Sequence, residues 1–235
     1  MFSIAIAEFR MLIRNRLVAA CAILIPLGFG AFFIYTGSQG GASVIAVFLV
    51  LIMIAMGVYV TATTTIAARR QTLFLKRLRS GAVGDAPIIA GLVLPVVLVS
   101  VVQIAIILVI LGMTSGTPPQ NVGLVIIGVL LAEIMFTGFA LATAGVTNSP
   151  EHAQITTLPL FIGVTGVAVW VTATGLSDLA LLKRALPGGG LAELISVGWA
   201  GGAVDNLALL VLPSLGWAAL AVVVARSMFK WEPRA

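Results

Sequence analysis

The stretch VGLVIIGVLLAEIMFTGFALATAG, residues Val122–Gly145, decides the class of fold. It is long enough to cross a hydrocarbon core about 30 Å thick, which takes about 20 helical residues. Because the stretch is continuously apolar instead of alternating, it predicts a helix and not a strand of a barrel. The whole chain agrees, since 60% of its 235 residues are hydrophobic and 9% are charged, which excludes an ordinary soluble domain.

Other apolar runs of similar length lie on both sides of this stretch. We therefore predict an all-α polytopic membrane protein, with residues 1–235 forming a single transmembrane domain. No cleavable signal peptide is expected, because the first run is long enough to span and lacks a clear small-x-small cleavage site. The six predicted transmembrane helices are residues 17–35, 42–66, 88–111, 122–145, 153–174 and 207–225.

The positions of the basic residues predict which loops face the cytoplasm. Three arginines lie within residues 1–16, five basic residues within 67–81, and three within 226–235. The loops TGSQGG and GMTSGTPPQN carry no charge. Since basic residues collect on the cytoplasmic side of a membrane, both termini and residues 67–81 are predicted to be cytoplasmic. Of thirteen basic residues, only Lys183 and Arg184 then lie outside.

Residues 1–16 form a predicted amphipathic helix that lies along the cytoplasmic membrane surface. The alternative is a frayed extension of the first span. The pattern behind the prediction has two stripes at helical spacing, an apolar one of Phe2, Ile6, Phe9 and Ile13 and a polar one of Ser3, Arg10 and Arg14.

Residues 175–206, before the last span, hold two apolar-rich pieces that are each too short to span, SDLALLKRAL and LAELISVGWAG. Pro187 and three glycines separate them, so they predict two short helices that cap the outer face. Ser177 or Asp178 is the expected N-cap of the first short helix.

Residues 67–81, which include ARRQTLFLKRLRSG at Ala68–Gly81, are predicted to form a short cytosolic helix with one greasy and one basic face. The helix could lie on the inner leaflet, where each basic residue contributes about 1 kcal/mol. Alternatively, it could dock into a groove on a soluble partner, with apolar anchors and arginines at the rim. The residues Phe74, Leu75 and Leu78 would then be the anchors.

This layout resembles the permease subunits of the ABC type-2 transporter family, which have six spans and a cytosolic coupling helix between spans two and three. The segment RRQTLFLKRLRSG, followed by DAPIIAGLVLP, is similar to their coupling region, which tends to read R-x-x-G-T-L-x-x-L-R-x-x-P. Gln71 stands where glycine is common, and Gly81 or Ala82 where proline is usual. The resemblance implies that the helix binds a separate ATPase through Arg69, Arg70, Thr72, Leu73, Phe74, Leu75, Arg77 and Leu78.

The resemblance also implies a complex of two permeases, as a homodimer, with two ATPases that bind ATP and Mg²⁺. The chain itself has no G-x-x-x-x-G-K-[ST] phosphate loop, no paired nucleophile and base, and one histidine, His152. We therefore expect no enzyme activity, no cofactor and no metal on this chain. The net charge of +5 follows the membrane topology, so no nucleic-acid partner is expected.

Glu133, near the centre of its span, is the outstanding polar residue inside the membrane. A lone carboxylate there costs about 2.5–3.5 kcal/mol, so it should face the bundle interior, be protonated, or both. It could recognise a cationic group or carry a proton, or it could be a structural hydrogen-bonding group. The candidate residues of a substrate pathway are Glu133, Gln103, Thr137 and Met56, and ordinary packing or interhelical hydrogen bonding is the alternative for the last three.

The function that the resemblance implies is export of a hydrophobic or amphipathic small molecule, such as a drug, an antibiotic or a lipid-like compound. The chain would be the permease subunit of an ATP-driven exporter in a bacterial inner or plasma membrane. Two alternatives stay open. One is a proton-coupled secondary transporter that uses Glu133, and the other is a membrane-assembly or sensor subunit without transport activity.

Overall fold

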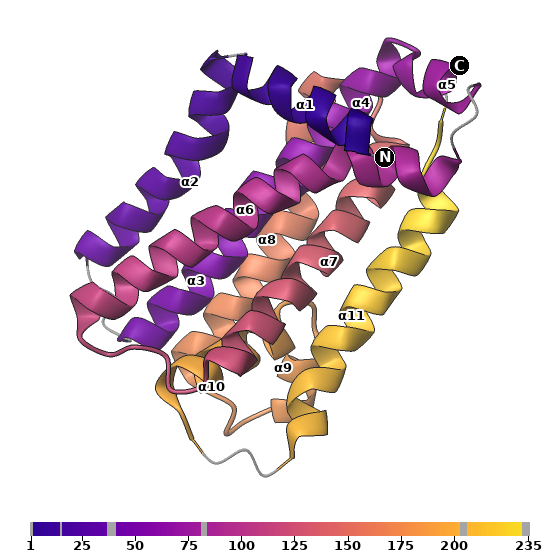
Figure 1. The fold of residues 1–235 in the computed structure, drawn as a ribbon. Coiled ribbons are helices and arrows are strands. Elements are labelled where there is room, and N and C mark those ends of the chain that lie inside the picture. The colour runs from indigo at the N-terminus through magenta and orange to yellow at the C-terminus, as the bar shows by residue number, and fades with distance from the viewer. Residues whose placement is uncertain (1, 15, 37–40, 81–83, 203–205, 232–235) are drawn as a thin grey trace.

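A computed structural model describes residues 2–14, 16–36, 41–80, 84–202 and 206–231, and every regular element within these ranges is helical. Figure 1 shows the helices gathered into one bundle with their long axes roughly aligned. The elements are α1 (Phe2–Arg14), α2 (Arg16–Thr36), α3 (Ala42–Ile54), η1 (Ala55–Val60), α4 (Thr61–Gln71), α5 (Phe74–Arg79), α6 (Asp85–Ser115), α7 (Val122–Val146), α8 (Pro150–Thr174), α9 (Ala180–Ala185), α10 (Gly189–Ala200) and α11 (Leu207–Met228).

Five helical stretches in the described residues are long and apolar enough to cross a membrane, namely Ala42–Gln71, α6, α7, α8 and α11. They cover the predicted spans two to six. Helix α2 covers the predicted first span and runs beside α3 and α6 (Figure 1). Its described apolar stretch, Leu27–Thr36, is shorter than a bilayer. The count of six spans therefore stays a prediction.

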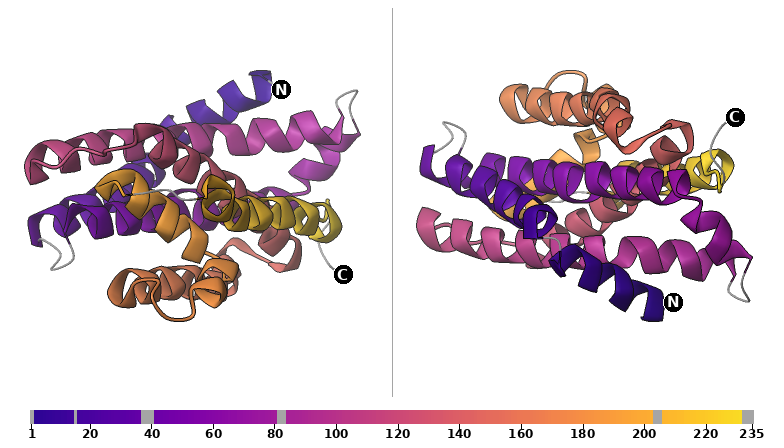
Figure 2. Two further views of the ribbon diagram at one scale, coloured as in Figure 1. Left: turned by 90° about the horizontal axis from the view of Figure 1, so that it is seen from below. Right: turned by 90° about the horizontal axis from the view of Figure 1, so that it is seen from above.

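Helix α7 lies at the centre of the bundle, with α11 packed along its length (Figure 1). Small residues permit this approach, since a Cβ atom added to Gly138 would lie 2.8 Å from Cβ of Ala221. Figure 2 shows α3 between α6 on one side and α8 on the other. This packing buries one large apolar cluster between the helices.

The second span contains a π-helical segment, η1, between α3 and α4. A π-helix has a longer turn than an α-helix. Here the Thr61 hydroxyl donates to the carbonyl of Met56, five residues earlier instead of four, at 3.2 Å. Within the segment, the Tyr59 side chain is fully buried, and its hydroxyl lies 3.0 Å from Oγ1 of Thr143 on α7. The π-helical segment therefore carries the tyrosine that forms a hydrogen bond with the central helix α7.

Helices α1 and α5 and the C-terminal end of α11 lie at one end of the bundle, which we call the α5 end (Figure 1). Helix α1 packs along α6 and turns Ala5 and Glu8 inward. Ile6 and Phe9, from the predicted apolar stripe, are 51% and 42% exposed, as an interfacial helix requires. The side chains of Phe2 and Ile13 lie outside the described residues.

Helices α9 and α10 lie at the opposite end, the α10 end, and agree with the two short helices expected there. Neither Ser177 nor Asp178 caps α9, because Leu179 is the N-cap residue, with φ of 55° and no side-chain hydrogen bond. Arg184 donates to both carboxylate oxygens of Glu193 at 2.6 and 2.7 Å, which joins α9 to α10. The pKa of Arg184 is raised above its ordinary value, chiefly by this hydrogen bonding with Glu193.

Candidate functional site

The segment between the second and third spans is a corner between α4 and α5. We expected one helix over residues 67–81, but α4 ends at Gln71 and the chain turns at Thr72 and Leu73 before α5 begins. Leu73 adopts a left-handed conformation with φ of 57°. The Thr72 hydroxyl donates to carbonyls of the last turn of α4, and Arg77 Nη2 donates to the Thr72 carbonyl at 3.2 Å.

The apolar side of α5 packs inward. Leu75 is fully buried in a cluster with Ile66 of α4 and Ile88 of α6, and Phe74 and Leu78 pack on this cluster while half-buried. These three side chains, expected as anchors for a partner, therefore hold α5 against its own chain. A displacement of α5 would be transmitted to the ends of α4 and α6 through this contact.

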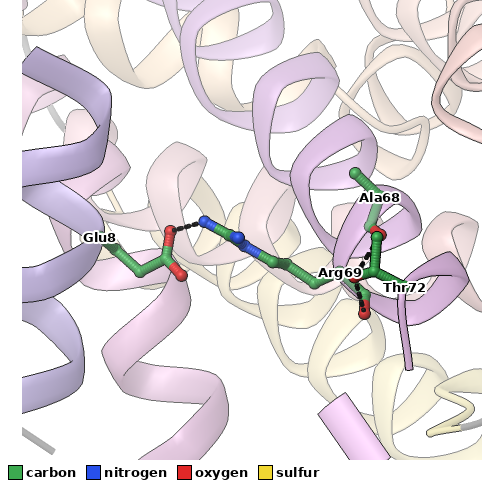
Figure 3. Close-up of polar contacts among 4 residues, drawn as sticks. All are labelled: Glu8, Ala68, Arg69 and Thr72. Atoms are coloured by element: carbon green, nitrogen blue, oxygen red, sulfur yellow. Dashed lines mark hydrogen bonds and ion pairs between the residues drawn. The ribbon is translucent and has the colours of Figure 1, made fainter. Parts of the chain in front are cut away.

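Arg69 connects the corner to the N-terminal helix. Its Nη2 donates to Oε2 of Glu8 on α1 at 2.8 Å, and the side chains are 27% and 9% exposed (Figure 3). Its guanidinium carbon also lies 5.1 Å from the centre of the Phe74 ring. A partly buried ion pair thus joins α1 to the last turn of α4.

Arg70 and Arg79 make two further connections from the corner. Arg70 is 1% exposed and donates to the carbonyl of Thr147, in the connection between α7 and α8. Arg79 pairs with Asp85 at the start of α6 at 3.2 Å, and it lies 5.1 Å from the Trp231 ring. With Arg77, which donates to the Thr72 carbonyl, at least four of the five arginines and lysines of this segment therefore bind the chain itself.

The other exposed side chains at the corner form what we call the corner surface: Gln71, Thr72, Leu73, Lys76, Arg77 and Ser80. Leu73 is 47% exposed at the turn. An apolar side chain beside basic ones at the outside of a tight turn suits contact with an acidic protein surface. Of the eight residues that the resemblance implies, Arg70 and Leu75 are buried, so any part they take is internal.

The candidate pathway residues inside the membrane do not line one cavity. Glu133 and Thr137, one turn apart on α7, both line a groove of about 700 Å³ between α6, α7 and α11. Gln103 of α6 is buried and Met56 lies in η1, and neither of them lines this groove. The groove therefore includes Glu133 and Thr137 but not the other two candidates.

In the part of the chain that the structure describes, no group of three His, Cys, Asp or Glu side chains is placed to hold a metal ion. Ser149 caps α8 by accepting a hydrogen bond from the amide of His152 at 3.4 Å. Serine is a favoured residue at this position of a helix because its hydroxyl accepts from an amide of the first turn.

Sequence reasoning missed the role of Glu8. A signal was available, since Glu8 is the sole acidic residue before Asp85, on a helix whose other charges are arginines. Its partner could not be read from the sequence, because the two residues are 61 positions apart.

Comparison with known proteins points to one family. A model of the family described as ABC-2 type transporter matches residues 2–167, which include α1, the corner and most of α8. No curated protein matches the chain.

Proposed function

The chain belongs to the ABC-2 type transporter family and is a membrane subunit of an ABC transporter, and we propose that it exports a small molecule with energy from a separate ATPase. The molecule is hydrophobic or amphipathic, such as a drug, an antibiotic or a lipid-like compound. The apolar walls of the groove beside Glu133 support this class of molecule.

The corner between α4 and α5 is the proposed contact with the ATPase. A movement of the ATPase would displace the corner surface, and α5 and the last turn of α4 would transmit this displacement into the bundle by three routes. These are the Leu75 cluster to α6, the Arg69–Glu8 ion pair to α1, and the Arg70 hydrogen bond to the connection after α7. Tightly packed contacts and ion pairs can transmit such a displacement because they resist deformation.

Two copies of the chain with two ATPases are the proposed assembly, in a bacterial inner or plasma membrane with both termini cytoplasmic. Helix α8 supports the homodimer, because it presents an exposed apolar face that includes Ile155, Leu158 and Ile162. A two-fold axis beside this face would place the two permeases around a shared pathway. Eleven of the thirteen basic residues fall within residues 1–16, 67–81 and 226–235, and this distribution supports a cytoplasmic placement of the α5 end.

The exposed leucine at the corner, Leu73, carries the proposal and supplies its test. Leu73→Gly removes an exposed apolar side chain. It also relieves backbone strain, because the left-handed conformation of Leu73 costs about 1–2 kcal/mol for a residue other than glycine. We therefore expect the variant to stay folded while co-purification of a co-expressed ABC ATPase that binds the parent permease falls by about tenfold.

Leu179→Gly is the matched control. Leu179 is also left-handed, with φ of 55°, and is 61% exposed, but it lies at the α10 end. Its substitution should leave the yield of ATPase unchanged. Equal yields of ATPase from the parent protein and the Leu73→Gly variant would refute contact through the corner surface.

A further inference from the structure

A second groove continues the one beside Glu133. It has a volume of about 680 Å³, lies between α6 and α7 toward the α10 end, and shares Val101 and Leu130 with the first. Exposed side chains such as Leu130, Ile134 and Val109 border the two grooves. The continuous channel, which we call the lateral groove, therefore opens on the bundle surface where the acyl chains of a membrane would lie.

The walls of the lateral groove are apolar along most of its length. In the outer half, Trp199 is the only lining residue with a polar side chain among those described. At the α5 end the groove reaches Asp85, Arg226 and Trp231. Between these limits, at the middle of α7, the polar residues that line it are Glu133 and Thr137. This is the pattern of a site for a long apolar molecule that carries one polar group.

Glu133 is 4% exposed, and neither of its carboxylate oxygens has a hydrogen-bond partner among the described residues. The buried Ser100 hydroxyl on α6 lies close enough to the Glu133 carboxylate to interact with it as a donor, although the two do not meet strict hydrogen-bond geometry. No lysine or arginine lies in any of the predicted spans. A buried carboxylate without a partner is costly, so a group that supplies protons or positive charge to it would be bound favourably.

Thr137 lies four residues after Glu133, on the same face of α7. Threonines in the other long helices, such as Thr63, Thr157 and Thr172, donate their hydroxyls to the carbonyl four residues earlier. The Thr137 hydroxyl makes no such bond, although it is buried. It is therefore available to accept a hydrogen bond from the same group that meets Glu133.

We propose that the lateral groove binds a hydrophobic amine, with its ammonium group between Glu133 and Thr137 and its apolar body along α6 and α7. The ammonium supplies several donors to the Glu133 carboxylate and the Thr137 hydroxyl, whereas Ser100 can supply only one, and it carries the opposite charge to a carboxylate. An acyl chain of a phospholipid would fill the groove but would leave these oxygens unsatisfied. The carboxylate lies beneath the groove surface, so the amine reaches it when the side chains of Leu130 and Ile134 part.

Binding is tested without ATP and without an ATPase, so the result is independent of the proposed transport. The permease is reconstituted into phosphatidylcholine nanodiscs and titrated with dodecylamine brominated at its tail, or with equally brominated dodecanol. Bromine quenches tryptophan fluorescence on contact, and Trp199 and Trp231 line the lateral groove. We expect saturable quenching by the amine at concentrations about tenfold or more below those needed for the alcohol, since a charge-assisted hydrogen bond contributes roughly 1.5–3 kcal/mol.

Glu133→Gln should weaken amine binding by about tenfold or more and leave binding of the alcohol unchanged. Thr137→Val, which keeps the shape, should weaken amine binding about threefold. Glu151→Gln is the control, because it removes an exposed carboxylate at the start of α8, away from the groove. This variant should bind the amine as the parent does.

Three results would overturn the proposal. One is quenching that never saturates, which means that the amine only dissolves in the lipid. The second is equal affinity for amine and alcohol. The third is unchanged amine affinity in Glu133→Gln. If Glu133→Gln does not elute as a folded, monodisperse protein in size-exclusion chromatography, two other variants decide the question. Unchanged amine binding in both Thr137→Val and Leu130→Trp, which fills the groove, would then overturn the proposal.

Discussion

Arg69 and Glu8 show how the charges of this chain are used at the level of single residues. Glu8 is nearly buried, so its carboxylate depends on the 2.8 Å contact with Arg69 (Figure 3). A buried carboxylate that loses its partner retains the desolvation penalty without the compensating bond. The pair therefore favours one position of α1 relative to α4, even though an ion pair of this kind adds little net stability.

We predict that Arg69→Met destabilises the purified permease by about 1–3 kcal/mol, because it leaves the Glu8 carboxylate buried and unpaired. Adding Glu8→Gln to this variant should recover part of the loss, since the uncompensated charge is then gone. Thermal unfolding of the two single variants and the double variant measures the coupling between the residues.

Arg10→Met is the control for this cycle, because Arg10 is an exposed arginine on the same helix as Glu8. It should change the free energy of unfolding by no more than about 0.5 kcal/mol. Strictly additive effects of the Arg69 and Glu8 substitutions would show that the ion pair does not form.

Lys183 and Arg184 are the two basic residues outside the segments predicted to be cytoplasmic, and local contacts account for their position. The Lys183 Nζ donates to the carbonyl of Gly175 at 2.6 Å and to Oγ1 of Thr174 at 2.8 Å, and the residue is 2% exposed. Arg184 is held by Glu193. Both side chains close the connection between α8 and α10, so their charges serve local structure and do not weaken the predicted orientation.

At the level of elements, the contact between α7 and α11 depends on the absence of a side chain at Gly138. A Cβ atom there would lie 2.7 Å from the carbonyl carbon of Ala221, which belongs to the backbone and cannot rotate away. Gly216, also on α11, has open space around the same position. The two glycines therefore predict opposite effects of the same substitution.

We predict that Gly138→Ala destabilises the permease by about 1–3 kcal/mol, because the added methyl group separates two helices that pack along their length. Each kcal/mol corresponds to a fall of about 2–4 °C in Tm for a chain of this size. Gly216→Ala should leave Tm unchanged or raise it, because alanine is the better helix former by about 0.5–1 kcal/mol. A lower Tm in Gly216→Ala than in Gly138→Ala would contradict the packing of α7 on α11.

At the level of the whole molecule, the bundle has two chemically different ends. The α5 end carries the basic corner and helix α1, and the α10 end carries two short helices joined by the Arg184–Glu193 ion pair (Figure 1). This asymmetry is what the distribution of basic residues predicts for a protein with one cytoplasmic face.

Cysteine labelling tests this orientation. In a Cys21→Ala background, single cysteines at Ser115 and Ser177, exposed residues near the α10 end, should react with an impermeant maleimide added to intact cells. A cysteine at Ser80, exposed at the end of α5, should react only after the cells are permeabilised. Labelling of the Ser80 variant in intact cells would reverse the assignment of the two faces.

Much of the architecture could be predicted from the sequence because its causes are local in the chain. Continuous apolar runs predicted helices close to α6, α7, α8 and α11, since a helix satisfies its own backbone hydrogen bonds within a membrane. The short helices before the last span followed from the length of their apolar pieces and from the break at Pro187. The corner was located because a basic stretch between two long apolar runs is conspicuous in composition alone.

The remaining features depend on contacts between residues far apart in the chain, which only the tertiary structure could decide. A helical wheel placed Leu75 on a greasy face, but it could not show that this face meets α6 instead of a partner. It also assumed one helix where Leu73 turns the chain. Glu133 was conspicuous in the sequence, and the spacing along α7 already placed it beside Thr137, yet its position on the lateral groove follows from how α6 and α11 pack around α7. Spacing along one helix determines which side chains share a face, whereas the packing of several helices determines what that face meets.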